Sequence, residues 1–129
     1  MTAGYTVISD DVRRFVLTSI PSVPHLEAAL LFHAAPHMVR NPADVARALY
    51  LPESRVADLL DSLCAAGILG RDAQGHYRYA PVDDALAHAI GELASAYSAD
   101  VIGVTHLIHD ATGKNAKRFA DAFKLRKDR

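Results

Sequence analysis

A chain of 129 residues with half of its side chains hydrophobic is long enough to bury a core of its own, and a single cysteine excludes an internal disulfide. It contains no apolar run near the roughly 20 residues of a membrane span and no basic flank typical of a signal peptide, so we expect a cytoplasmic protein. The net charge of −1 combines a balance of +5 over residues 114–129 with a balance of −6 over residues 1–113, so the excess of basic charge is confined to the tail.

Two short helices are predicted at the start of the chain. Ser9 is a favourable N-cap for the first, whose apolar residues recur at helical spacing up to Pro21. Ser22 and Pro24 begin the second helix, and Pro36 ends it.

The most informative stretch is residues 41–81. Asn41-Pro42 begins a short helix, because asparagine caps well and proline suits the first helical position. Pro52 opens a second helix that stops at Gly67, and a two-stranded hairpin follows with its turn at residues 72–75. The apolar sides of the two helices consist of Val45, Ala46, Leu49, Val56, Leu59, Leu60 and Leu63. The stretch therefore predicts helix, turn, helix and hairpin.

One long helix is predicted from Val82 to about Asp110. Apolar side chains recur along it at steps of three and four, a spacing that presents a continuous seam to a partner helix. The candidate dimerisation residues on this seam are Leu86, Ile90, Leu93, Tyr97, Val101, Val104 and Ile108. Gly103 allows close helix approach but equally suits a kink. A final basic helix is predicted over residues 115–125.

Helix, turn, helix and hairpin together resemble the winged helix-turn-helix of small bacterial transcriptional regulators, and the long helix after the hairpin is similar to the layout of the MarR and PadR types. The resemblance implies a mainly α-helical fold with a small β-hairpin. It divides the chain into a winged helix-turn-helix domain with leading helices at residues 1–81 and a dimerisation region at residues 82–129. In such regulators the leading helices either complete the core or form part of the dimer surface, and the sequence leaves both open.

The resemblance further implies a homodimer that binds double-stranded DNA and regulates transcription, with its two recognition helices meeting half-sites about one DNA turn apart. The outward side of the second motif helix would face base edges, and nearby arginines would contact phosphates. The candidate DNA-binding residues are Arg40, Arg47, Ser54, Arg55, Asp58, Ser62, Arg71, His76 and Arg78.

Acidic side chains on the second motif helix point to an alternative function. Asp58 and Asp61 lie one turn apart on its outward side, where they bring negative charge toward DNA phosphates. The alternative is a protein-interaction adaptor that does not read DNA and whose acidic helix binds a basic protein partner.

Motifs for catalysis, a cofactor or a metal are missing from the sequence. It has no nucleophile elbow, dinucleotide fingerprint or P-loop, so we expect no enzyme and no cofactor. His106 and His109, and also His33 and His37, have helical spacing, but no Cys-x-x-Cys or His-Glu-x-x-His motif accompanies them, and we expect no metal site. Cys64 is expected to pack as a small core residue.

Overall fold

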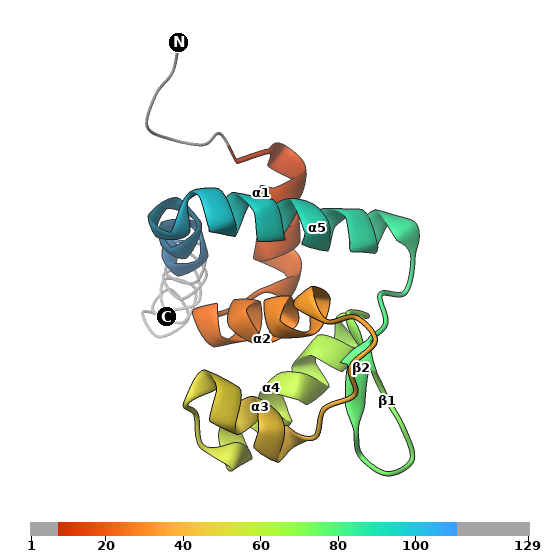
Figure 1. Cartoon of the computed structure of the whole chain (residues 1–129). Helices are drawn as coiled ribbons and strands as arrows, with labels where there is room; N and C mark the ends of the chain where they lie inside the picture. Colours follow the sequence, from red (N-terminus) through yellow and green to blue (C-terminus); the bar gives the residue numbers. More distant parts are fainter. Residues whose placement is uncertain (1–7, 111–129) are drawn as a thin grey trace, which may run out of the picture.

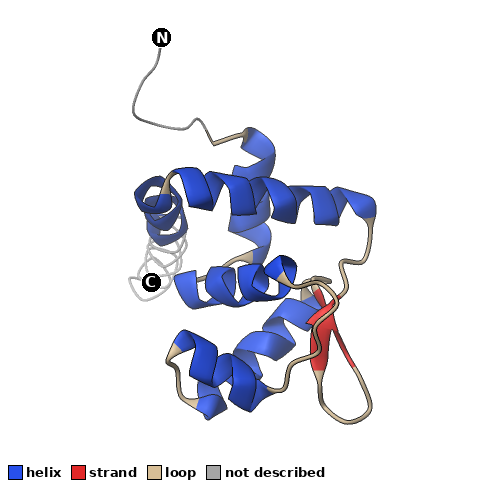
Figure 2. Cartoon of the chain, in the orientation of Figure 1, coloured by secondary structure: helices blue, strands red, loops and turns tan. Residues whose placement is uncertain are grey.

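The computed structural model describes residues 8–110 (Figure 1). This part of the chain is mainly helical with one small antiparallel hairpin, as predicted (Figure 2). Its elements are α1 (Asp10–Ser19), α2 (Val23–Ala34), α3 (Pro42–Leu49), α4 (Glu53–Ala65), β1 (Leu69–Arg71), β2 (Tyr77–Tyr79), α5 (Asp84–Ala99) and a last helical segment over residues 101–110.

The second helix, α2, is the centre of the fold. It contacts α3, α4, α5 and β2, and in Figure 1 it lies between α5 above and α3 and α4 below. The buried side chains of the two leading helices are Val12, Phe15, Val16, Leu26, Ala28, Ala29 and Phe32. Both leading helices therefore complete the core, which is the first of the two possibilities that the sequence leaves open.

Helix starts in the structure follow the capping residues of the sequence. The hydroxyl of Ser9 accepts a hydrogen bond from the Val12 N–H at 3.2 Å. The side chain of Asn41 accepts one from the Asp44 N–H at 2.8 Å, and the Asp44 carboxylate accepts one from the Asn41 N–H in return. This reciprocal pair is a capping box, which satisfies two backbone donors that have no partner inside the helix.

Tyr50 ends α3 in a left-handed backbone conformation, with φ 58° and ψ 45°, and the residue is 93% exposed. Because glycine adopts this conformation without steric cost, we expect Tyr50→Gly to raise the free energy of unfolding by about 1 kcal/mol. Urea denaturation followed by circular dichroism measures the change. Tyr50→Ala removes the same ring but keeps a Cβ, so it is the control. If Tyr50→Gly were no more stable than Tyr50→Ala, the left-handed backbone would carry no strain.

The hairpin has the predicted turn. Gly75 N–H donates to the Asp72 carbonyl at 3.1 Å, and Gly75 itself has φ +80°. The Asp72 carboxylate accepts hydrogen bonds from the N–H groups of Gln74 and His76, both at 2.9 Å, and the bond from His76 is the main reason that the pKa of this carboxyl is lowered. An unexpected third segment lies on the other side of β2, because Arg40 and Tyr77 exchange backbone hydrogen bonds of 2.8 and 2.9 Å.

The predicted single helix from Val82 to Asp110 is wrong, because the helix breaks at Asp100. This residue leaves helical geometry at φ −149° and ψ 77°. Its carboxylate accepts a hydrogen bond from the Gly103 N–H at 2.9 Å, and its carbonyl accepts one from the Val104 N–H at 3.1 Å. Asp100 therefore caps the segment over residues 101–110. A Cβ at Gly103 would collide with this carboxylate, so a larger residue there would displace the capping side chain.

The predicted dimerisation seam is also corrected by the structure. Ile90, Leu93, Val104 and Ile108 are fully buried within the chain itself, and Leu86 and Tyr97 are partly buried against the same core. Val101, in contrast, is 50% exposed. The apolar periodicity marks the side of α5 and of the following helix that closes this core, so these six buried or half-buried residues do not form a free surface for a second copy.

Buried side chains from both sides of residue 81, the predicted domain boundary, join in one cluster. Among the described residues, no single helix is long and apolar enough to cross a membrane, although α1 and α2 pass the same test as a pair bent by 110°. The predicted basic helix at residues 115–125 lies outside the described residues.

Candidate nucleic-acid interface

The fourth helix turns one side to the core and the other to solvent. Val56, Leu60 and Leu63 are fully buried, and α4 contacts both α2 and α3 through this side. The opposite side is exposed and carries Ser54, Asp58 and Ser62 at successive turns. The predicted inner and outer sides of this helix are therefore correct.

The start of α4 differs from the other helix starts. Pro52 stands at its N-cap position, and no side chain caps the helix. The N–H groups of Arg55 and Val56 reach the Pro52 carbonyl at 3.1 and 3.2 Å. The N–H groups ahead of them have no carbonyl within the helix to bond to. A helix end of this kind favours anions such as phosphate.

One edge of α4 is joined to the hairpin through Asp61. The phenol of Tyr77 donates a hydrogen bond to Asp61 Oδ1 at 2.7 Å, and the Arg71 guanidinium lies 3.7 Å from the same oxygen. Arg71 also lies over the Tyr77 ring, 5.7 Å from its centroid. These three side chains, which we call the Asp61 cluster, connect α4 with both strands.

The phenol in the Asp61 cluster stays protonated over the ordinary pH range. Tyr77 is only 3% exposed. Burial, followed by the hydrogen bond to Asp61, raises its pKa to about 12. At neutral pH the hydroxyl is therefore a donor, and the carboxylate of Asp61 is its acceptor.

Two exposed arginines lie on the hairpin. Arg71 pairs with Tyr77 across the strands, and Arg78 pairs with Gly70. Because neighbouring residues of a strand point to opposite faces, Arg71 shares a face with Tyr77, and Arg78 lies on the other face. The stem of the hairpin therefore presents positive charge on both faces.

The remaining basic candidates lie on α3, at the hairpin turn and in the segment that pairs with β2. Arg47 is exposed on α3 and forms an ion pair with Asp44 of the same helix. His76 lies 3.7 Å from Asp72 at the hairpin turn. Arg40 is half-buried, and within the described chain its Nε is buried without a hydrogen-bond partner.

A shallow hollow of about 230 Å³ lies along the other edge of α4. Arg55 and Asp58 line it from α4, and Ser22 and His25 line it from the start of α2. The Ser22 hydroxyl and His25 Nδ1 lie 2.6 Å apart, and burial lowers the pKa of this histidine. Arg55 therefore flanks the exposed side of α4 on the edge away from the hairpin.

The Asp61 cluster and the backbone pairing of Arg40 with Tyr77 were not predicted from the sequence. Asp61 and Tyr77 are 16 residues apart, and their contact depends on how the hairpin packs against α4. The alternation of the strand places Tyr77 and Tyr79 on one face, which is the one sequence signal for a buried hairpin side.

In the described part of the chain, Cys64 and His33 pack against neighbouring side chains. Cys64 is half-buried against the core, as predicted, and burial raises the pKa of its thiol. His33 makes an edge-to-face contact with Tyr79 at 5.6 Å between ring centroids. Over residues 8–110, no group of three or more His, Cys, Asp or Glu side chains could hold a metal ion.

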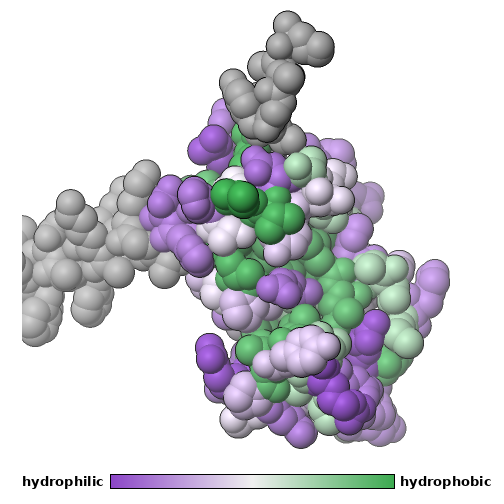
Figure 3. All heavy atoms as spheres, turned by 60° about the vertical axis from the view of Figure 1, so that its left-hand side comes forward, coloured by the Kyte–Doolittle hydropathy of each residue, from purple (hydrophilic) through white to green (hydrophobic). Residues whose placement is uncertain are grey.

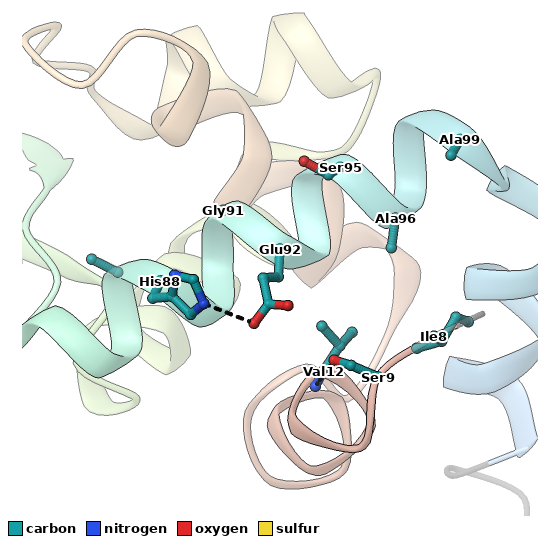
Figure 4. Close-up of a pocket in the computed structure, with 10 residues that line it drawn as sticks. Ile8, Ser9, Val12, His88, Gly91, Glu92, Ser95, Ala96 and Ala99 are labelled. Atoms are coloured by element: carbon teal, nitrogen blue, oxygen red, sulfur yellow. Dashed lines mark hydrogen bonds and ion pairs between the residues drawn. The ribbon is translucent and has the colours of Figure 1, made fainter. Parts of the chain in front are cut away.

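A groove of about 660 Å³ lies between α1 and α5 (Figure 4). Its α5 wall includes four small residues at a spacing of four, namely Ala87, Gly91, Ser95 and Ala99, together with His88, Glu92 and Ala96. In Figure 4 the Glu92 carboxylate points toward the start of α1, and His88 Nε2 lies 3.1 Å from it. The α5 wall of the groove therefore carries polar side chains beside its small ones.

Apolar side chains are exposed where α5 ends. Val101 and Ile102, which follow Ala99 and Asp100 in the chain, are 50% and 70% exposed. Figure 3, which turns this end of the molecule forward, shows hydrophobic side chains in green among polar ones on this face. An apolar surface thus adjoins the helix that borders the groove.

Two features of the described chain can support a function: the exposed side of α4 with the adjoining hairpin, and the groove between α1 and α5. Comparisons with protein-family models, with curated proteins and with solved structures found no match for this chain.

Proposed function

We propose that α3, α4 and the hairpin form a winged helix-turn-helix that binds double-stranded DNA, and that the protein is a transcriptional regulator acting as a homodimer. The observation that carries the proposal is the exposed side of α4, which has short polar side chains along its middle and arginines on both edges. Ser54, Asp58 and Ser62 form the middle, and Arg55 and the hairpin arginines lie beside it.

The middle of this side suits base edges. A serine hydroxyl both donates and accepts, so it can pair with any base, and an aspartate can accept from the amino group of cytosine. Short side chains also let the helix approach the floor of the major groove. The uncapped start of α4 adds backbone N–H groups that can bind a phosphate.

The edges suit the DNA backbone. Arg47, Arg55, Arg71 and Arg78 are all exposed, on α3, α4 and the hairpin. Contacts of this kind position a domain on DNA without reading its sequence. They also make binding depend on salt, because each neutralised phosphate releases counterions.

Titration of a fluorescently labelled duplex of mixed sequence tests the proposal. We expect anisotropy to report binding that weakens between about 50 and 200 mM salt, with a log–log slope of roughly −3 to −4 per protomer if four arginines of each copy contact a phosphate. Absence of binding at the lowest salt, or binding that is insensitive to salt, would contradict it.

For the homodimer, we propose that a second copy occupies the groove between α1 and α5. Residues four apart lie on one side of a helix, so the four small residues of this wall let another helix approach α5 closely, beside the polar pair His88 and Glu92. The exposed apolar pair Val101 and Ile102 extends the surface beyond the end of α5. The proposed dimer contact therefore uses the open side of α5 that lines the groove, and not the buried seam.

Gly91→Leu is expected to convert the dimer to monomers. No atom lies within 4 Å of a Cβ at Gly91, so a side chain can start there without a clash in the single chain, and leucine favours a helix over glycine by about 0.8–1 kcal/mol. It would nevertheless fill the groove. Sedimentation equilibrium measures the mass, and Ala85→Leu, on an exposed position outside the groove lining, is the control. A dimer that survives Gly91→Leu, or a wild-type protein that is monomeric, would contradict this arrangement.

The adaptor function remains the second candidate because of Asp58. It lies in the middle of the exposed side of α4, and no ion pair to it is formed within the described part of the chain. An acidic helix face of this kind would suit a basic peptide. Failure to bind DNA, together with binding of a lysine-rich peptide that Asp58→Lys abolishes, would favour the adaptor.

A further inference from the structure

Asp58 and Asp61 occupy equivalent places in the sequence pattern but different surroundings in the structure. Both are exposed, one turn apart on α4. Asp61 accepts the Tyr77 hydrogen bond and pairs with Arg71, whereas Asp58 borders the hollow on the other edge of the helix. The two acids are therefore expected to affect DNA binding differently.

Building on the proposed function, we infer that Asp61 is a positioning residue for DNA binding, which holds the hairpin against α4 and places Arg71 for a phosphate, whereas the net effect of Asp58 on a duplex of mixed sequence is repulsion. Removing the negative charge of Asp58 should therefore strengthen DNA binding, and removing that of Asp61 should weaken it.

The hydrogen bond from Tyr77 supplies the first part of the reasoning. Loss of the acceptor would leave a buried phenol without a hydrogen bond, which costs free energy. The hydrogen bond to Asp61 therefore holds the hairpin in a fixed position against α4. Since Tyr77 also pairs with the backbone of Arg40, this one residue connects α4, both strands and the segment before α3.

The position of Arg71 supplies the second part. Its guanidinium lies between the Asp61 carboxylate and the face of the Tyr77 ring, which limits the conformations of a long side chain. A guanidinium has five N–H donors, so contact with one carboxylate oxygen leaves others for a phosphate. The positive charge of Arg71 also offsets the negative charge of Asp61, so this acid repels DNA less than Asp58 does.

The isosteric variants Asp58→Asn and Asp61→Asn test the inference, because each removes one negative charge from the same helix. In duplex titrations at a fixed salt concentration we expect Asp58→Asn to bind several-fold more tightly. We expect Asp61→Asn to bind roughly five- to tenfold more weakly, and its salt slope to be smaller by about one per protomer as the phosphate contact of Arg71 is lost.

Two further variants separate positioning from loss of folding. Tyr77→Phe changes no charge but removes the hydrogen bond, which the amide oxygen of an asparagine at position 61 can still accept. It should therefore weaken binding on its own, and the double variant should bind no more tightly than either single variant. Urea denaturation confirms that each variant is folded at the temperature of the titration. An unchanged salt slope in a folded Asp61→Asn variant would indicate a structural role only, and would overturn the inference.

The remaining outcomes distinguish this inference from the proposed function. If Asp61→Asn bound DNA as tightly as Asp58→Asn or the wild type, Asp61 would not position the hairpin, and the inference would fail while DNA binding stood. If the wild-type protein bound no DNA at low salt, the proposed function would fail and the inference with it.

Discussion

Leu60→Ala is expected to lower the free energy of unfolding by about 2–5 kcal/mol. Leu60 is fully buried on the inner side of α4, which contacts α2 and α3, so the missing atoms would leave a cavity that the surrounding helices fill only in part. Urea denaturation should show a lower midpoint with an unchanged slope.

Leu17→Ala is the matched control for this loss. Leu17 lies on α1 and is 53% exposed, so the same truncation should cost less than about 1 kcal/mol. Equal losses at the two positions would mean that α4 does not pack through Leu60 as described.

The double variant Arg71→Glu/Arg78→Glu is expected to weaken duplex binding by roughly 100-fold, taking about 1.4 kcal/mol for each arginine. Each hairpin loses two phosphate contacts, so the salt slope should also fall by about two per protomer. Anisotropy titration at several salt concentrations measures both quantities.

Net charge alone would also weaken DNA binding, and Arg13→Glu/Arg14→Glu controls for it. These exposed arginines lie on α1, which Figure 1 places at the opposite end of the fold from α3 and α4. The control changes the net charge by the same amount. If both double variants lost the same affinity, the hairpin would have no special part in binding.

The fold up to Tyr79 was predictable because its signals are local. Asn41-Pro42 caps α3, and Asp72 and Gly75 make the hairpin turn with their own backbone groups. Each signal acts within four residues, so it reads the same in the sequence and in the folded chain.

The break at Asp100 was missed because two local signals conflict. The apolar residues keep a helical spacing across Asp100, which favours one long helix. Asp100 and Gly103 together favour a new helix start, and the capping hydrogen bonds between them prevail in the structure. An aspartate inside an apolar helical pattern, with glycine three residues later, is the signal that could have indicated the break.

The seam and the Asp61 cluster depend on packing between distant segments. Periodicity shows that Ile90 and Leu93 lie on the apolar side of a helix, but it does not show whether the chain itself or a second copy covers that side. Likewise, nothing in the sequence pairs Asp61 with Tyr77, because that contact requires the hairpin to fold back onto α4. The sequence therefore predicts that Asp58 and Asp61 are alike, whereas within the described residues only Asp61 has partners on the hairpin.

The central claim is that DNA meets the exposed side of α4 and the stem of the hairpin, and amide chemical shifts measured during a DNA titration test it most directly. The account predicts that duplex DNA shifts the amides of Ser54, Asp58 and Ser62 together with those of Arg71 and Arg78. It also predicts that the chemical shifts of the amides along the groove side of α5 do not change. Shifts confined to α1 and α5, or none at all at low salt, would contradict the account.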